Sequence, residues 1–289
     1  MNCNICPRHC NVNRTSNNGF CGAPDTIKIA KYMKHFWEEP IISGKMGSGA
    51  IFFSHCNLKC LYCQNYQISA NGQGKEVTIN ELIDIIKELE NSGVHNINLV
   101  TPTHYTNQIT EALRLYKPSI PIVWNSNGYE SVETIEKIKD LVDIYLVDMK
   151  YMDNYLAFDL SKAKDYPEIC KQAILQMRKN QPKDIIEEGL MKKGVIIRHL
   201  VLPNEIENSF KVLDWINSAL GTNTLISIMG QYTPCHIAKN LPKYSRPLKP
   251  IEYKRVFAHL QKLGFDNGFV QELSSASDNF IPDFDKFSD

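Results

Sequence analysis

The chain has 289 residues, 43% of them hydrophobic, which is enough for one large α/β domain or two modest ones. Basic and acidic residues each number 32, so the net charge is zero. This balance disfavours a nucleic-acid partner, because phosphate binding needs a basic excess on some face. No apolar stretch approaches the roughly 20 residues that span a membrane, and no basic, apolar leader opens the chain. We therefore expect a cytoplasmic protein without a membrane partner.

Residues 1–45 are rich in cysteine and show little periodicity. Cys3, Cys6 and Cys10 have the spacing C-x2-C-x3-C, and Cys21, followed by Gly22, is the fourth cysteine of this segment. Because seven of the nine cysteines fall in the first 63 residues at short spacings, metal ligation in a reducing compartment explains them better than disulfides. Four thiolates suit either tetrahedral zinc or a second iron–sulfur cluster. We predict a metal-binding segment over 1–45 and a catalytic domain over 46–289.

From about residue 49, short apolar runs alternate with helical patterns. A helix is expected to begin after Thr78, with Glu81 completing a capping box and Gly93 ending it. Pro167 and Pro250 suit the first turns of two further helices. We expect strands over 50–53, 96–100, 122–124, 144–147, 195–202 and 225–228.

This order of strands and helices predicts a parallel sheet with helical crossovers. About six units are too few for a closed eight-fold barrel. The predicted fold is therefore an α/β partial (β/α)6 TIM-like barrel behind a small cysteine-rich segment, with a doubly wound sheet as the alternative. In either case active residues are expected at the carboxyl ends of the strands.

A second cysteine run follows the first strand of this alternation. Cys56, Cys60 and Cys63 have the spacing C-x3-C-x2-C, with Tyr62 just before the last. Most cubane iron–sulfur clusters have four protein ligands, so three thiolates leave one iron open to a substrate or cofactor. Structural cysteines, or a zinc site with a distant fourth ligand, are the alternative interpretation.

These cysteines are accompanied by five further segments in order: 96–104, 123–130, 143–151, 198–204 and 229–234. With this combination the chain resembles the radical S-adenosylmethionine (SAM) superfamily, and within it the pyruvate formate-lyase activating enzyme-like family, over nearly its whole length. The resemblance implies an oxidoreductase that reductively cleaves SAM at a [4Fe–4S] cluster to a 5′-deoxyadenosyl radical, which abstracts hydrogen.

The resemblance further implies a protein or peptide substrate, such as a glycyl residue of a partner enzyme, and a flavodoxin- or ferredoxin-type reductant. An open iron also implies sensitivity to oxygen. Modification of a small metabolite or of another peptide remains an alternative. A non-catalytic electron-transfer or metal-binding scaffold is a third. Because the neighbouring site at Cys56, Cys60 and Cys63 needs electrons, we favour an iron–sulfur cluster over zinc at the N-terminal cysteines.

The resemblance also suggests contacts to SAM. The family's Gly-Gly-Glu motif, which binds the SAM amino group, is replaced here by Thr101-Pro102-Thr103-His104. Backbone carbonyls and threonine hydroxyls would have to accept those hydrogen bonds. Lys150, in the D-x-K pattern that begins at Asp148, is expected near the SAM carboxylate. The full set of expected SAM contacts is Tyr62 (through its backbone), Thr101, Thr103, Asn127, Asp148, Lys150, Arg198 and His199.

Ordinary structural roles compete with several of these assignments. Asp148 and Lys150 are also compatible with a surface ion pair, and Asn127-Gly128 with a turn. His199, like most single histidines, is also compatible with a buried, hydrogen-bonded role. Cys170 is expected to be a small buried hydrophobe. Cys235 is compatible with either a buried thiol or an active-site group.

Overall fold

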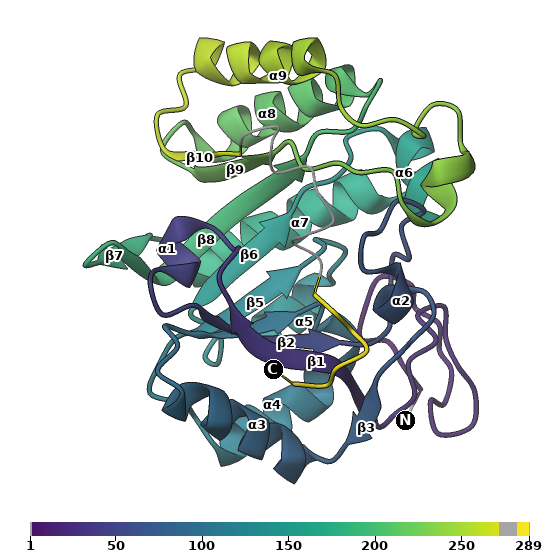
Figure 1. Ribbon diagram of the computed structural model, residues 1–289, viewed down its shortest axis with the longest axis vertical. Coiled ribbons are helices and arrows are strands. Elements are labelled where there is room, and N and C mark those ends of the chain that lie inside the picture. The colour runs from purple at the N-terminus through teal and green to yellow at the C-terminus, as the bar shows by residue number, and fades with distance from the viewer. Residues whose placement is uncertain (1, 272–281, 289) are drawn as a thin grey trace.

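A curved, open sheet runs through the molecule (Figure 1), and the computed structural model describes residues 2–271 and 282–288. In the described part of the chain the strand order is β10-β9-β8-β6-β5-β4-β2-β1-β3, with β7 paired to β8. The strands are β1 (Ile27–His35), β2 (Ser48–Phe53), β3 (Lys75–Val77), β4 (Ile97–Val100), β5 (Ile122–Ser126), β6 (Ile144–Asp148), β7 (Ile185–Glu187), β8 (Leu190–Leu200), β9 (Leu225–Met229) and β10 (Gly268–Val270).

The six predicted strands are β2, β4, β5, β6, β8 and β9, and they pair in parallel in this order. The predicted partial barrel of parallel strands is therefore confirmed. β10 adds a further parallel strand beside β9. At the opposite edge β1 and β3 are antiparallel, and neither was predicted. β1 lies within residues 1–45 yet pairs with β2, so part of that segment belongs to the central sheet. The division of the chain near residue 45 stays a prediction.

Helices connect the parallel strands and pack against one another in pairs, α3 with α4, α5 with α7 and α8 with α9. Their bounds are α1 (Pro40–Ser43), α2 (Tyr66–Ser69), α3 (Ile79–Asn91), α4 (Thr106–Leu115), α5 (Val132–Lys137), α6 (Asn154–Ser161), α7 (Tyr166–Asn180), α8 (Ile206–Leu220) and α9 (Pro250–Lys262), with 3-10 turns at η1 (Thr103–Tyr105) and η2 (His236–Asn240).

The predicted helix starts have the expected chemistry. Thr78 caps α3 by accepting from the Glu81 backbone N–H, and the Glu81 carboxylate accepts from the Thr78 N–H at 2.7 Å. This reciprocal box satisfies two N–H groups that the helix itself leaves free. Pro167 and Pro250 lie in the first turns of α7 and α9, where a missing N–H costs nothing.

The alternation of side chains along the strands creates two different faces. Trp124, Tyr145 and Val195 belong to the main core beneath the helices. Their neighbours Val123, Ile144 and Ile196 belong to a smaller cluster with Ile42 of α1, on the inner face of the barrel. Since successive side chains point to opposite faces, every second residue continues the inner face toward the carboxyl ends of the strands. There the face changes from apolar to polar, at Asn125, Asp148 and Arg198.

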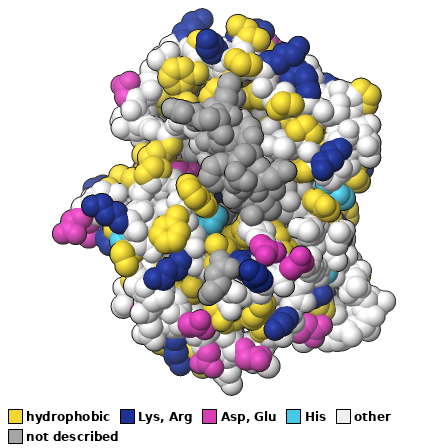
Figure 2. All heavy atoms as spheres, in the orientation of Figure 1, with side chains coloured by type: hydrophobic (Ala, Val, Ile, Leu, Met, Phe, Trp, Pro, Cys, Tyr) yellow, Lys and Arg dark blue, Asp and Glu magenta, His cyan; other side chains and the backbone are white. Residues whose placement is uncertain are grey.

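The described C-terminal residues return to the β1 edge of the sheet (Figure 1), where Ser288 forms a bridge with Tyr32. Acidic and basic side chains both occur on the face shown in Figure 2, with hydrophobic side chains between them. Among the described residues, no helix is both long and apolar enough to cross a bilayer.

Candidate active site

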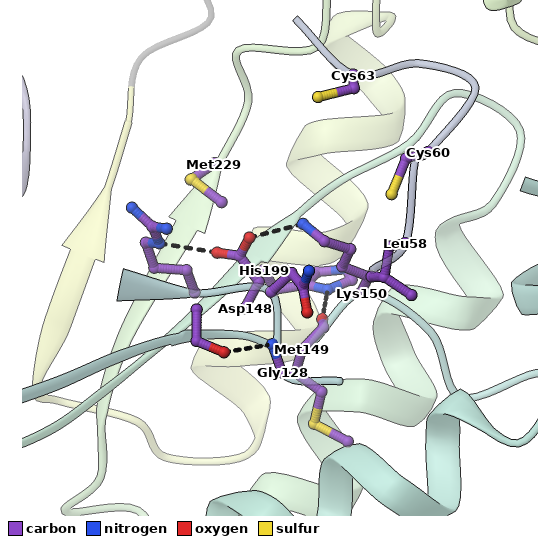
Figure 3. A network of polar contacts seen from close by, with 12 residues as sticks. Leu58, Cys60, Cys63, Gly128, Asp148, Met149, Lys150, His199 and Met229 are labelled. Carbon is purple, nitrogen blue, oxygen red and sulfur yellow. Dashed lines mark hydrogen bonds and ion pairs between the residues drawn. The ribbon is translucent and has the colours of Figure 1, made fainter. Parts of the chain in front are cut away.

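A cavity of about 410 Å³ opens at the carboxyl ends of the parallel strands. The loop that follows β2 forms one wall and carries three cysteines. The ends of β5, β6 and β8 form the opposite wall and carry amide and charged side chains. Figure 3 shows Cys60 and Cys63 on the loop and the Asp148–Lys150 pair beside them. Parallel strands bring residues far apart in the sequence to one edge of the sheet, as expected for this class of fold.

Each thiol of the cysteine wall accepts a hydrogen bond from one side chain. Asn127 Nδ2 lies 3.3 Å from Cys56 Sγ, and Ser161 Oγ lies 3.0 Å from Cys60 Sγ. Ser69 Oγ completes the set at 3.2 Å from Cys63 Sγ. These donors come from the residue after β5, from α6 and from α2, so three separate parts of the fold fix the positions of the sulfur atoms. Polar groups that donate to sulfur are typical surroundings of metal-bound thiolates.

The cysteine wall fits an iron–sulfur cluster. Burial raises the pKa of Cys63 to about 12 and also raises the pKa of Cys60, although Lys150 partly offsets the latter. The thiols of Cys60 and Cys63 therefore stay protonated until a cation replaces the protons, as metal ligands do. Among the described residues, no group of three or more Cys, His, Asp or Glu side chains is placed to hold a single metal ion.

The opposite wall is a network of paired charges centred on Arg198. The guanidinium donates from Nε to Asp148 Oδ1 at 2.8 Å and from NH1 to Glu38 Oε2 at 3.0 Å. It also donates from NH2 to Asn125 Oδ1 at 2.6 Å. Burial alone would raise the pKa of Asp148, but Arg198 and Lys150 together outweigh it and hold that pKa below its ordinary value. Asp148 is therefore a carboxylate at neutral pH.

Lys150 connects the two walls. Its Nζ donates to Asp148 Oδ2 at 2.6 Å, and its charge lowers the pKa of Cys60. Burial lowers the pKa of Lys150, whereas Asp148 and Cys60 raise it, and the net shift is upward. The side chain is 14% exposed. A cation held in this place can bind an anionic group of a ligand that lies between the walls.

Most of the residues predicted from the sequence line this cavity. They are Cys56, Cys60, Tyr62, Cys63, Thr101, Asn127, Asp148, Lys150 and Arg198. Thr101 has a positive φ of 57° at the end of β4, which is uncommon for a residue with a side chain. The backbone carbonyl of Tyr62, expected near the adenine, accepts a hydrogen bond from Cys235 Sγ at 3.1 Å.

Thr103 and His199 are not among the described residues that line the cavity. The Thr103 hydroxyl donates to the buried Glu130 carboxylate at 2.7 Å. His199 Nδ1 and Nε2 form hydrogen bonds with Met149 O and Ser209 Oγ. Because His199 follows Arg198 on β8, it points to the opposite face of the sheet, toward the helices. Burial lowers the pKa of His199 to about 4, consistent with a neutral, structural histidine.

The end of β1 and the segment that leads to α1 add residues that were not predicted. His35, Trp37 and Glu38 line the cavity, and Glu38 accepts hydrogen bonds from Asn98 and Asn125 as well as from Arg198. Nothing in the local sequence marks Glu38. Asn125 had a signal, since it lies two positions after Val123 on the inner face of β5.

The N-terminal cysteines form a separate group outside the cavity lining. Cys6 and Cys21 are buried, whereas Cys3 and Cys10 are partly exposed. Burial raises the pKa of Cys6 to about 12, with contributions from Cys21 and Cys10 that show the proximity of these thiols. Burial likewise raises the pKa of Cys21, with contributions from Cys3 and Cys10. The fold therefore gathers the four predicted ligands into one region.

Comparison with known proteins gives both a family and relatives. The sequence profile of the radical SAM superfamily matches residues 50–216. Uncharacterized protein MJ0674 of Methanocaldococcus jannaschii is 33% identical over 275 residues, covering 92% of this chain and 76% of that protein. Uncharacterized protein MJ0808 of the same organism is 22% identical over 283 residues, covering 87% and 75%.

Two solved structures share the fold at low identity. Methylornithine synthase has a TM-score of 0.50 and 13% identity, covering 74% of this chain and 60% of that one. The structure of anSMEcpe with bound AdoMet and Cp18Cys peptide has a TM-score of 0.50 and 15% identity, also over 74% and 60%. This chain thus spans about 60% of the length of these two solved chains.

Proposed function

This chain belongs to the radical SAM superfamily, and on that premise we propose that it cleaves SAM in the described cavity and abstracts hydrogen from a protein or peptide. Membership implies an enzyme with a [4Fe–4S] cluster and SAM. The main observation behind the proposal is the arrangement of the cavity: three hydrogen-bonded thiols form one wall, and paired charges form the opposite wall. Such an arrangement offers ligands for the cluster and charged partners for an amino acid group of SAM.

The residues of the chain have separable tasks in this proposal. Cys56, Cys60 and Cys63 would hold the cluster, which when bound supplies the electron that converts SAM to methionine and a 5′-deoxyadenosyl radical. Lys150 is held by Asp148 so that it can bind the SAM carboxylate with a charge-assisted hydrogen bond. Arg198 keeps Asp148 ionised and in place. The cysteine loop packs through the fully buried Leu58, which helps to keep water away from the thiols.

A protein or peptide substrate, as for a glycyl-radical activating enzyme, is supported by the edge of the cavity. Trp37 lines it while remaining 61% exposed, and the adjacent Phe36 is 48% exposed. Exposed aromatic side chains beside a cavity are suited to contact an extended chain rather than to enclose a small molecule. The resemblance to the pyruvate formate-lyase activating enzyme-like family suggests that the residue attacked is a glycine, and we include this in the proposal.

The test is hydrogen transfer into the product. Anaerobically reconstituted protein would be reduced with dithionite and given SAM with glycine-containing peptides deuterated at the glycine α-carbon, including the glycyl loop of a glycyl-radical enzyme. The proposal expects deuterium in 5′-deoxyadenosine and a radical signal on the peptide. Formation of 5′-deoxyadenosine without deuterium from any peptide, but with deuterium from a labelled metabolite mixture, would reject the peptide substrate and favour a small metabolite.

A further inference from the structure

The N-terminal loop holds its four cysteines in an organised arrangement. The loop closes on itself where Cys3 N donates to Val12 O at 2.8 Å and Asn11 N donates to Cys3 O at 3.0 Å. Cys6 and Cys21 are each 7% exposed, although the loop itself has little apolar core. Four cysteines gathered in one short loop, two of them buried, are a suitable ligand set for a metal centre bound by four thiolates.

Backbone N–H groups point at these sulfur atoms. Phe20 N lies 3.3 Å from Cys10 Sγ, and Ala23 N lies 3.4 Å from Cys21 Sγ. The second contact joins a cysteine to the residue two positions later, and the same contact occurs in the cavity loop, where Leu58 N lies 3.4 Å from Cys56 Sγ. Donors of this kind stabilise the negative charge on a metal-bound thiolate. The two cysteine groups therefore share local geometry.

Gly19 lets the backbone approach one of these thiols closely. A Cβ atom at this position would lie 3.0 Å from Cys10 Sγ and 3.1 Å from Cys10 Cβ. A side chain here would displace Cys10 from its place in the loop. Glycine, which has no side chain, allows the backbone at this position to lie close to the sulfur of Cys10.

Four thiolates suit either tetrahedral zinc or an iron–sulfur cluster. The superfamily's cavity cluster takes up electrons, and zinc, which has no redox chemistry, could not supply them. The cluster is therefore the occupant that we test at the N-terminal cysteines.

Two amide side chains connect the groups. Asn57 lies close enough to the Cys6 thiol to lower its pKa, against the larger effect of burial, and its Oδ1 accepts from Asn127 Nδ2 at 2.7 Å while its Nδ2 donates to Tyr129 O at 2.8 Å. Asn127 Nδ2 also lies 3.3 Å from Cys56 Sγ. Asn57 is fully buried, and Asn127 is 8% exposed. Two side chains therefore span the distance from a thiol of one group to a thiol of the other.

We propose that Cys3, Cys6, Cys10 and Cys21 bind a second iron–sulfur cluster, which the Asn57–Asn127 pair holds in electronic contact with the cavity site. The partly exposed Cys3 and Cys10 form its outer side and Cys6 its inner side. A low-potential, one-electron donor of the ferredoxin or flavodoxin class would reduce the outer site. The same electron then passes inward by way of Cys6 and Cys56, so the outer site is reoxidised and the inner site gains one electron, without proton transfer or bond cleavage. Only the use of that electron rests on the proposed function.

The test is the metal content and the electron paramagnetic resonance spectrum of the full chain, without SAM or substrate. We expect about eight irons per chain, as for two [4Fe–4S] clusters. When both clusters are reduced, the spectrum should be split or broadened by their interaction. It should differ from the sum of the spectra of C6S/C21S and C56S/C60S, which each retain one cluster. Cys170→Ala removes a buried cysteine outside both groups and should keep the wild-type iron content.

The alternatives give different results. About four irons with one zinc per wild-type chain would overturn the second cluster, and this measurement does not depend on any variant folding. About eight irons with a spectrum equal to the simple sum would overturn the contact between the clusters. Asn57→Leu should keep about eight irons but slow electron transfer from the N-terminal cluster to the cavity cluster, followed after rapid reduction of the outer site, by about tenfold. An unchanged transfer rate in that variant would overturn the role of the amide pair. None of these results requires SAM cleavage, so failure here is distinct from failure of the proposed function.

Discussion

The two walls of the cavity reach their working state in different ways. In the charged wall, Lys150, Asp148, Arg198 and Glu38 are joined by ion pairs of 2.6 to 3.0 Å, so its electrostatics are complete in the folded chain. In the cysteine wall the thiols have hydrogen-bond donors, but burial favours the neutral form of Cys60 and Cys63. Under the proposed function, that wall would acquire its charge only when iron binds. The chain would then preorganise the charged wall for SAM and leave the redox centre to be assembled.

Removal of one cysteine should prevent the cysteine wall from holding its proposed cluster. Cys60→Ala takes away one of three ligands of the proposed cluster, so we expect iron at the cavity site and SAM cleavage both to be abolished. Iron analysis and chromatographic detection of 5′-deoxyadenosine would measure this. Cys170→Ala, a buried cysteine of α7, is the matched control and should retain both. Cleavage that survives in Cys60→Ala would contradict the assignment of the three ligands.

Neutralising Asp148 should disrupt the ion pairs of the charged wall and destabilise the fold. Asp148→Asn leaves Lys150 without its ion-pair partner in a site where that side chain is 14% exposed, so the free energy of unfolding should fall by about 3 kcal/mol at pH 7. Urea unfolding of the apo protein would measure it. Lys139→Ala, which breaks an exposed ion pair with Glu136, is the control and should have little effect.

The same substitution predicts a pH dependence. Because the pKa of Asp148 is lowered in the folded protein, its stabilising contribution is present above the ordinary Asp pKa of about 3.9 and is lost as the pH falls through the lower folded value. Wild-type stability should therefore decrease from pH 5 into the acid range more than that of Asp148→Asn. Parallel profiles for the two proteins would show that the ion pairs of Asp148 do not lower its pKa.

Lys150→Ala should separate the functions of the two walls. The change removes the proposed partner of the SAM carboxylate but no cluster ligand, so iron content should be unchanged. Loss of one charge-assisted hydrogen bond should weaken SAM binding by about tenfold. Equilibrium binding at fixed salt would test this, with Lys171→Ala, a surface lysine of α7 paired with Glu168, as control. An unchanged Kd would contradict the role of Lys150.

The smallest expected effect concerns the hydrogen bonds to sulfur. Ser69→Ala removes the hydroxyl that lies 3.2 Å from Cys63 Sγ. Fewer donors stabilise the reduced cluster less, so the reduction potential should become more negative by about 20 to 60 mV, if one hydrogen bond is worth ~0.5–1.5 kcal/mol. A redox titration would measure this. No shift, or a shift to a more positive potential, would show that Ser69 does not stabilise the reduced form.

Periodicity and spacing were sufficient for much of this structure. Each of the six strands predicted from apolar runs is present and parallel to its neighbours. The predicted helix starts are also present, with a capping box at Thr78 and with Pro167 and Pro250 in first turns. β1 was missed because its apolar and lysine residues lie in a segment that otherwise reads as a cysteine-rich loop. β10 is short and pairs only along Gly268–Val270, so it left little signal.

The residues of the candidate site were harder to predict from the sequence, for two physical reasons. Arg198 and His199 are neighbours on one strand, and strand alternation could have assigned only one of them to the cavity. Glu38 depends on a contact with Arg198, 160 residues later in the chain, and no local pattern encodes such a contact. The cysteine spacing was informative because a cluster imposes a local requirement on its ligands, whereas ion pairs across the barrel impose none.

The most direct measurement is the formation of 5′-deoxyadenosine by the wild-type protein, reconstituted anaerobically with iron and sulfide and supplied with SAM and dithionite. If the cysteine wall holds the cluster and the charged wall binds SAM, the protein should form 5′-deoxyadenosine and methionine in equal amounts, and their formation should require both iron and reductant. If fully loaded protein that binds SAM forms no 5′-deoxyadenosine under reduction, with or without candidate peptides, the cavity does not perform radical SAM cleavage and the proposed function is wrong.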